Sequence, residues 1–404
     1  MLHRRALLVA GAASAGGLVT GAHAAIGAQS PASMLAPGAP LSGYGARARS
    51  TEAIQRIVPD LAFPGSGSSR TPLQLLEGTI TPNDLHFERH HNGIPDVDPA
   101  AHELLIHGLV RQPLLFRYED LLRYSRESRI LFLECSGNSS ALNAAQPVQA
   151  SAGQLNGLLS CAEWTGVRLS TLLDEAGIAA QARWVQAEGA DAAGMTRSIP
   201  LSIAQDDALI ALFQNGEPLR PAQGFPMRLL LPGIEGNASV KWLRRLKVMA
   251  TPAFSRDETS KYTDLRADGK ADQFSLRMGV KSIILRPSFG LDLHGPGYQE
   301  ISGLAWSGRG RIRKVEVSAD GGRSWAEAAL GGPVLPKAPI RFRMPWAWDG
   351  GPATLMSRAT DETGAVQPLR AAWLARYGAG QTYHGNVIQS WGVDAQGKIA
   401  HVYA

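Results

Sequence analysis

The chain has 404 residues, of which 44% are hydrophobic and 19% are charged, so it carries enough apolar material for two or three globular domains. Its 40 basic and 35 acidic residues give a formal net charge of +5, and the basic residues are scattered along the sequence. This composition excludes a fibrous or wholly disordered protein. It also indicates a mildly basic surface that suits an acidic protein partner and not a nucleic acid.

The first 24 residues have the form of an export signal. Arg4 and Arg5 precede a short stretch rich in Ala, Gly, Val and Leu, and Ala22 and Ala24 fit a signal-peptidase site. Adjacent arginines are typical of the twin-arginine route, which exports folded proteins. An ordinary secretory signal, which exports the unfolded chain, is the alternative. We therefore expect a periplasmic protein without a permanent membrane span.

Residues 25–70 are rich in Ala, Gly, Ser and Pro and show little hydrophobic periodicity. This pattern predicts an N-terminal arm that either lies over the surface or is partly disordered.

Residues 71–251 combine short strand and helix patterns without a regular βαβ alternation, which predicts an α+β domain. Ser170 and Gly177 are the predicted N-cap and stop of a helix over residues 169–176, and a shorter helix is expected over 118–123. Strands are predicted at residues 102–108, 130–134, 183–187, 198–201, 209–213, 227–231 and 246–250, and Asn215-Gly216 predicts a hairpin.

Residues 252–279 read as a polar connector, and residues 280–404 contain only strand and turn patterns. Short strands are predicted at residues 282–285, 301–306, 312–318 and 340–344, separated by turn signals such as Asp320-Gly321-Gly322. This spacing is typical of a β-sandwich.

Cys135 directly follows the strand predicted over residues 130–134, and Ser136, Gly137 and Asn138 break that strand into a turn. A thiol at this point faces a cleft, and the glycine lets a large cofactor approach the backbone. A buried core cysteine is the other interpretation, and Cys161 reads as such a core position.

Residues 133–138 (Leu-Glu-Cys-Ser-Gly-Asn) resemble the cysteine motif of the sulfite oxidase family of molybdenum enzymes. Further family motifs follow in the expected order at residues 87–91, 224–228, 240–242 and 315–325. The resemblance covers about residues 71–404, and within the family it points to the molybdenum subunits of bacterial sulfane dehydrogenases. It implies a molybdopterin-binding domain over residues 71–251 and an immunoglobulin-like domain over 280–404 that forms a homodimer.

The resemblance also implies roles for individual residues. The Cys135 thiolate would ligate a molybdenum atom held by a pyranopterin dithiolene. Arg228 and Lys241 would take the pterin and its phosphate, while Arg89 and His91 would lie by the pterin near the metal. Without the motif, an ordinary ion pair or a solvated position would explain Arg228 and Lys241 equally well.

The resemblance assigns further residues to the cofactor or to catalysis. Phe87 and Gln223 belong to the cofactor set, with Gln223 standing where relatives often carry histidine. Asn138 either bonds the cofactor or caps its turn, and Asp191 is either a cofactor contact or a turn residue. Tyr262 is the candidate for a catalytic tyrosine beside Cys135 and Arg89, with a core or surface tyrosine as the alternative.

Two departures from the family pattern bear on the substrate. Relatives that oxidise free sulfite carry an arginine shortly after the cysteine and another in the C-terminal domain, where Ser140 and Gly385 stand in this chain. A small dianion needs paired positive charge to replace its hydration. The lack of these arginines argues against tight binding of free sulfite, and the resemblance implies instead a sulfane sulfur carried as a persulfide on a carrier-protein cysteine, oxidised with oxygen from water.

The chain has no Cys-x-x-Cys-His motif and only 2 cysteines, so we expect neither a covalent c-type haem nor an all-cysteine iron–sulfur cluster. A c-type cytochrome subunit is then the implied electron acceptor. Two other functions stay open at this point. One is a periplasmic sulfite dehydrogenase of the same family, and the other is a non-catalytic exported binding protein.

Overall fold

The computed structural model describes residues 31–59, 65–259, 261–379 and 383–404, so the predicted signal at residues 1–24 lies outside the described residues. The chain divides into two units, Met1–Glu52 and Ala53–Ala404. In the described part of the first unit, every residue except Thr51 is exposed. Short 3₁₀ helices form there at Ala32–Met34 and Arg49–Thr51.

The cysteine predicted to bind a cofactor directly follows a strand of one sheet of the second unit. The strands of this sheet run in the order β10-β9-β6-β5, and β11 also pairs with β9. The central strand, β6, pairs antiparallel with both β5 and β9. The strands are β5 (Glu127–Glu134), β6 (Leu159–Arg168), β9 (Leu209–Gln214), β10 (Glu217–Pro218) and β11 (Arg228–Leu230).

A second sheet has the order β4-β3-β12-β7-β8, and only its β3–β12 pair is parallel. Apolar side chains of this sheet, of β9 and of α3 form a common buried core. The strands are β3 (Glu103–Gly108), β4 (Leu114–Arg117), β7 (Trp184–Gly189), β8 (Thr196–Pro200) and β12 (Leu243–Met249), and the helices are α1 (Tyr118–Leu121), α2 (Ala152–Asn156), α3 (Leu169–Ala176) and α4 (Leu201–Asp206).

The predicted helix over residues 169–176 is confirmed as α3, which ends at Gly177 in the left-handed conformation. Its predicted N-cap was wrong, because Arg168 holds that place and Ser170 lies inside the first turn. The strand predicted over residues 198–201 ends at Pro200, where α4 begins; this helix and α2 were not predicted.

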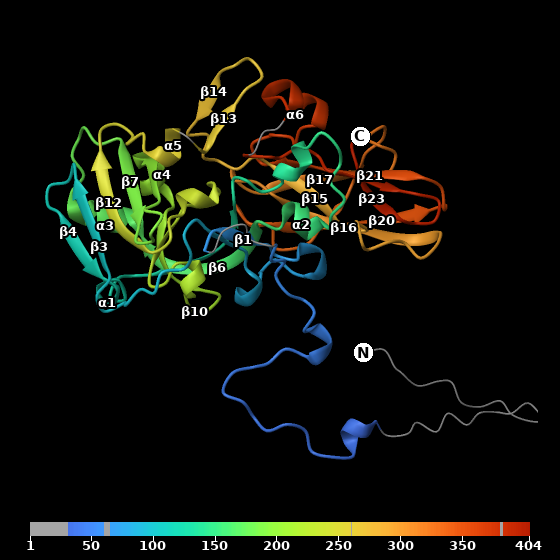
Figure 1. The fold of residues 1–404 in the computed structure, drawn as a ribbon, viewed down its shortest axis with the longest axis horizontal. Coiled ribbons are helices and arrows are strands. Elements are labelled where there is room, and N and C mark those ends of the chain that lie inside the picture. Colours follow the sequence, from blue (N-terminus) through green and yellow to red (C-terminus); the bar gives the residue numbers. More distant parts are fainter. Residues whose placement is uncertain (1–30, 60–64, 260, 380–382) are drawn as a thin grey trace, which may run out of the picture. The chain divides into compact units, whose positions relative to one another are not determined.

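The C-terminal strands form two sheets, as predicted for a sandwich (Figure 1). Their orders are β15-β16-β20-β19 and β18-β17-β21-β22-β23, and Trp306, Phe342 and Trp391 belong to the core of this region. The strands are β15 (Lys281–Arg286), β16 (Gly297–Trp306), β17 (Ile312–Ser318), β18 (Ala326–Glu327), β19 (Ala329–Leu330), β20 (Ile340–Trp348), β21 (Ala353–Asp361), β22 (Ser390–Val393) and β23 (Ile399–Val402).

The prediction that this region holds only strands and turns was wrong, because α6 (Arg370–Tyr377) buries Trp373 against the sandwich core. With an α+β region followed by an all-β sandwich, the predicted fold class itself is confirmed.

Two short antiparallel pairs shape the surroundings of the cysteine. β1 (Gly67–Ser69), from the end of the predicted arm, pairs with β2 (Glu88–His90). In the predicted connector, α5 (Arg256–Thr259) precedes the hairpin of β13 (Thr263–Leu265) and β14 (Ala271–Gln273). Among the described residues, no helix has both the length and the apolar character needed to cross a bilayer.

Candidate active site

A pocket of about 740 Å³, its open mouth included, lies at the end of β5 beside β2. Every predicted site residue except Asn138 lines it: Phe87, Arg89, His91, Cys135, Asp191, Gln223, Arg228, Lys241 and Tyr262. Segments far apart in the sequence thus bring the predicted residues together around one cavity.

Cys135 is placed by the end of the β5–β6 ladder. Its N–H donates to the Leu158 carbonyl at 3.0 Å, and its carbonyl accepts from the Asn138 N–H at 2.9 Å, which closes the turn. Burial raises the pKa of the thiol, while a hydrogen bond from the Gly137 N–H and the positive charge of Arg89 act in the opposite direction. A bound cation would favour the thiolate form and make Cys135 a ligand.

Asn138 caps the turn and does not line the pocket. Its side-chain amide donates to Glu134 Oε1 at 2.9 Å, and its oxygen accepts from the Leu158 N–H at 3.1 Å. Both polar atoms of the side chain are therefore used within the chain, and the structure places Asn138 behind Cys135 instead of against a cofactor.

Arg228 and Lys241 form a cationic end of the pocket. Arg228 donates to the carbonyls of Gln223 and Ser239 at 3.0 and 2.8 Å, but its buried Nε has no hydrogen-bond partner within the described chain. Lys241 donates to the carbonyls of Arg89 and Ala222 at 3.2 and 3.0 Å. No ion pair of either side chain with a carboxylate is found among the described residues, unlike the ordinary ion pair considered above.

Burial lowers the pKa of both cations, that of Arg228 to about 9, and the charge of Arg228 adds to the effect on Lys241. Glu88 and Asp191 also line the pocket and partly oppose the effect on Lys241, but neither forms an ion pair with the two cations among the described residues, which leaves this part of the wall suited to an anionic ligand. Gly224 lets the two side chains approach, since its φ is +106° and an added Cβ would lie 3.0 Å from Lys241 Cβ.

His91 connects Arg89 with Tyr262. Its Nδ1 lies 3.4 Å from an Arg89 guanidinium nitrogen, and its Nε2 lies 3.2 Å from the Tyr262 hydroxyl. Burial and the charge of Arg89 lower the pKa of His91 to about 4, so the ring is neutral. With Arg89 as the donor to Nδ1, the Nε2–H then donates to Tyr262.

Tyr262 is buried at the pocket wall, which favours its interpretation as a site residue over a surface tyrosine. Burial raises the pKa of its hydroxyl, and the negative charge of a Cys135 thiolate adds to this. The hydroxyl therefore stays protonated and can donate a hydrogen bond into the pocket.

The remaining predicted residues are placed as follows. Gln223 donates to the Phe87 carbonyl at 3.0 Å, and Asp191 lies in the loop between β7 and β8. Ser140 is exposed and Gly385 is buried, and neither lines the pocket. Cys161 is buried in the core as predicted, and both cysteines are free thiols.

A molybdopterin fits this set of residues. A soft sulfur ligand lies at one part of the wall, and a buried guanidinium with an unpartnered Nε and a half-buried ammonium lie at another. Gly236 lets its segment pack closely against the backbone before Cys135, because an added Cβ would lie 2.9 Å from the Glu134 carbonyl oxygen. One cavity thus offers both a thiol that can ligate a metal and cations that can bind a phosphate.

Sequence reasoning missed four charged residues behind the turn: Arg197, Glu235 and Lys281 are buried, and the His384 side chain is 9% exposed. A single charged residue in a strand or loop has no periodicity or spacing that marks it as buried. Only the three-dimensional contacts identify these four.

Two family models match the chain. The oxidoreductase molybdopterin binding domain matches residues 91–256, and the Mo-co oxidoreductase dimerisation domain matches residues 273–390.

The chain is also similar to characterised proteins. Mitochondrial sulfite oxidase of Mus musculus is 32% identical over 327 residues, which cover 74% of this chain and 59% of that protein. Sulfite oxidase of Gallus gallus is 32% identical over 330 residues, with 74% of this chain and 71% of that protein covered. The chain thus spans less than two thirds of the mouse relative.

One solved structure extends the similarity over nearly the whole chain. The sulfane dehydrogenase SoxCD from Paracoccus pantotrophus matches with a TM-score of 0.88 and 42% sequence identity. The match covers 91% of this chain and 96% of that one.

Proposed function

The chain belongs to the sulfite oxidase family of molybdopterin oxidoreductases, and on this premise we propose that it is the molybdenum subunit of a sulfane dehydrogenase. Its substrate is a sulfane sulfur carried as a persulfide on the cysteine of a carrier protein. The observation that carries the proposal is the higher identity to sulfane dehydrogenase SoxCD than to the sulfite oxidases.

Molybdenum on a pyranopterin dithiolene supplies oxygen-atom transfer coupled to two-electron chemistry when it is bound. Cys135 would hold the metal, and Arg228 and Lys241 would pair with the phosphate of the pterin. Phe87, Asp191 and Gln223 line the same pocket and complete the proposed cofactor set.

Arg89 and Tyr262 are the groups of this chain that can hold oxygen atoms of the substrate. The Arg89 guanidinium supplies a permanent positive charge, and the protonated Tyr262 hydroxyl supplies a neutral donor. His91 keeps the two side chains in place through its two ring nitrogens. Each oxygen atom that the sulfur gains from water releases two protons and two electrons.

The electrons pass to a c-type cytochrome subunit, since the sequence contains no motif for a covalent haem. The Mo-co dimerisation domain supports a homodimer through the C-terminal region. We propose a periplasmic location reached by the twin-arginine route, on the basis of the paired arginines Arg4 and Arg5. The proposed domain limits remain residues 71–251, 252–279 and 280–404.

A sulfite dehydrogenase is the second candidate, and the similarity to two sulfite oxidases favours it. Ser140 and Gly385 also lie outside the pocket lining. The absence of arginine at these two positions is therefore a weaker argument against free sulfite as the substrate. A non-catalytic binding protein is not supported, because the chain belongs to an oxidoreductase family.

The test is steady-state reduction of cytochrome c by the molybdenum-loaded protein with its cytochrome subunit. Free sulfite is compared with a persulfidated carrier protein at matched sulfur concentration. We expect turnover with the carrier only. Fast turnover with free sulfite would instead establish the second candidate.

Metal analysis provides the matched control. Cys135→Ala should lose the bound molybdenum, whereas Cys161→Ala removes the other thiol, which is buried away from the pocket, and should keep the metal. Equal molybdenum in both variants would contradict the role of Cys135.

A further inference from the structure

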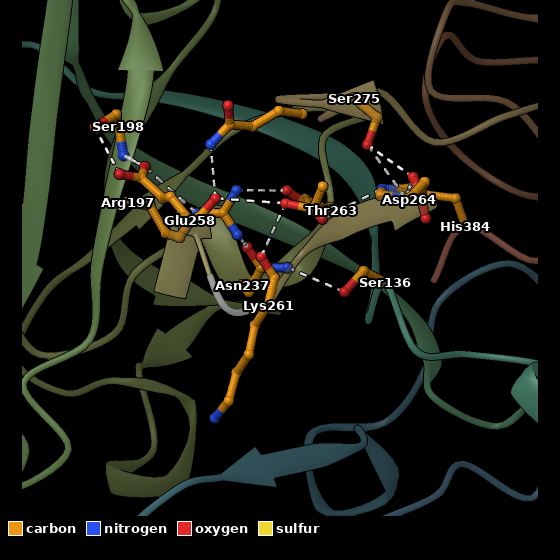
Figure 2. A network of polar contacts seen from close by, with 12 residues as sticks. Ser136, Arg197, Ser198, Asn237, Glu258, Lys261, Thr263, Asp264, Ser275 and His384 are labelled. Atoms are coloured by element: carbon orange, nitrogen blue, oxygen red, sulfur yellow. Dashed lines mark hydrogen bonds and ion pairs between the residues drawn. The ribbon is translucent and has the colours of Figure 1, made fainter. Parts of the chain in front are cut away.

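Behind the Cys135 turn lies a buried network of charged side chains that the proposed chemistry does not use (Figure 2). We refer to Arg197, Glu235, Glu258, Asp264 and His384 as the charged network; the first four are buried, and the His384 side chain is 9% exposed. Figure 2 shows that Arg197 and Glu258 lie on one side of it and Asp264 and His384 on the other.

His384 lies between two carboxylates. Its Nδ1 is 2.6 Å from Asp264 Oδ2, and its Nε2 forms an ion pair with Glu235 Oε2 at 3.2 Å. The Nε2 contact is an ion pair without hydrogen-bond geometry, and the two carboxylates together raise the pKa of the ring to about 10, which favours the imidazolium. The network therefore contains two cations, Arg197 and His384, on either side of Glu235.

Two arms of the network hold Ser136, the residue that follows Cys135. The backbone N–H of His384 donates to the Ser136 carbonyl at 2.8 Å. The Asn237 side chain donates to the Ser136 hydroxyl at 3.1 Å, and Asn237 in turn accepts a hydrogen bond from Arg197. Arg197 also pairs with Glu235 at 2.8 Å, so both arms meet at the same carboxylate.

The network also contacts the segment that carries Tyr262. Asp264 belongs to β13, two residues after Tyr262, and the Arg197 guanidinium lies 4.8 Å from the centre of the Tyr262 ring. Tyr262 and His384 both have left-handed backbones, with φ of +52° and +53°. Residues other than glycine keep this conformation only where surrounding contacts enforce it.

We propose that His384 is a positioning residue, which fixes the Cys135 turn and the Tyr262 segment relative to each other from the C-terminal region of the chain. The inference deepens the proposed function and rests on Cys135 as the metal ligand. Its physical basis is that groups behind a ligand set the ligand's orientation and so tune the metal. The assembled protein then needs the charged network for catalysis as well as for folding.

The test compares three variants of the holoenzyme: His384→Asn, His384→Arg and His401→Asn. Asparagine tolerates the left-handed backbone but removes the cation, and arginine keeps a cation that can donate to two carboxylates. His401 is the matched control, because it is a buried histidine of the same region that bonds only to the Val148 carbonyl through its ring. Molybdenum content, the electron paramagnetic resonance spectrum of the half-reduced metal, kcat and KM are measured.

We expect His384→Asn to keep its molybdenum, to change the spectrum and to lower kcat about 10- to 100-fold with little change in KM. His384→Arg should recover part of kcat and of the spectrum, and His401→Asn should resemble the wild type in both. A wild-type spectrum and kcat in His384→Asn overturn the inference, as does an equal effect in His401→Asn.

If His384→Asn does not fold, Asp264→Asn takes its place, because it keeps the shape of the side chain while removing one charge from the same network. A changed spectrum supports the inference, and an unchanged one overturns it. Failure of the proposed function is distinguishable from either outcome for the variants, because it appears in the wild-type protein itself, as missing molybdenum or as turnover of free sulfite.

Discussion

Substitution of Lys281 tests how the C-terminal region stabilises the cysteine turn. The Lys281 ammonium is 1% exposed, lies 3.3 Å from Glu134 Oε1 and donates to the Gly385 carbonyl at 2.7 Å. Burial lowers the pKa of Lys281, and the charge of Glu134 opposes that effect. Lys281→Met fills the same space but leaves the Glu134 carboxylate buried without its cation.

Removing one partner of a buried ion pair costs about 3–5 kcal/mol. Here the cost should fall at the lower end, about 3 kcal/mol, because Glu134 keeps hydrogen bonds from Trp306 Nε1 and the Asn138 amide. Urea unfolding followed by tryptophan fluorescence measures the change, since Trp306 lies at the site.

A double-mutant cycle separates the ion pair from packing. We expect Lys281→Met combined with Glu134→Gln to cost at least about 1 kcal/mol less than the sum of the two single changes. Lys314→Met is the matched control, because its ion pair with Glu316 is 39% exposed at the lysine and should contribute less than about 1 kcal/mol. A loss below about 1 kcal/mol for Lys281→Met, or additive single effects, would refute the reasoning.

Three further predictions follow from the site. Tyr262→Phe should lower kcat at least about tenfold without changing the melting temperature, because it removes only the hydroxyl from a packed ring. Arg228→Leu should lower the molybdenum content measured by metal analysis, yet raise the melting temperature of cofactor-free protein, because it removes a desolvated cation. Burial alone would lower the pKa of His384, but the contacts with Asp264 and Glu235 raise it from its usual 6.5 to about 10. Because the pKa of His384 is raised on folding, its protonated ring stabilises the folded state fully below pH 6.5, and this stabilisation is lost as the pH rises toward 10. The free energy of unfolding should therefore fall between pH 6.5 and pH 10 more steeply in the wild type than in His384→Asn.

The sequence was sufficient to predict the pocket residues that belong to contiguous motifs. Cys135, Arg228 and Lys241 lie in short segments that resemble motifs of the family, and the structure gathers them around one cavity. Asn138 lies in the same motif as Cys135 but serves the turn. A motif therefore identifies a segment more reliably than it assigns a role to each residue in it.

The strand β6 shows why part of the fold escaped prediction. Gly166 interrupts its pattern and lowers the strand preference, yet the register shifts at this residue and an added Cβ would lie 2.1 Å from the Ile210 carbonyl oxygen. The close approach of β9 thus requires a glycine at position 166, and that same glycine kept β6 from being predicted as a strand. Ser170 failed as an N-cap for a related reason, because β6 continues to Arg168 and α3 begins directly after it.

His384 and Lys281 could not be predicted because their burial depends on contacts between distant segments. Lys281 is the first residue of β15, and His384 lies in a loop before β22, yet both bond to the turn that follows β5. Charged residues are usually exposed, so each one alone would be assigned to the surface.

The electrostatics of the pocket link cofactor binding to the stability of the whole chain. Arg228 and Lys241 are desolvated without a carboxylate partner among the described residues, which costs free energy as long as no anion is present. A bound phosphate supplies the missing countercharge, and a ligand at one hundred times its dissociation constant stabilises the folded state by about 2.7 kcal/mol. The protein loaded with the cofactor is then the more stable form, so its melting temperature should lie above that of the cofactor-free protein.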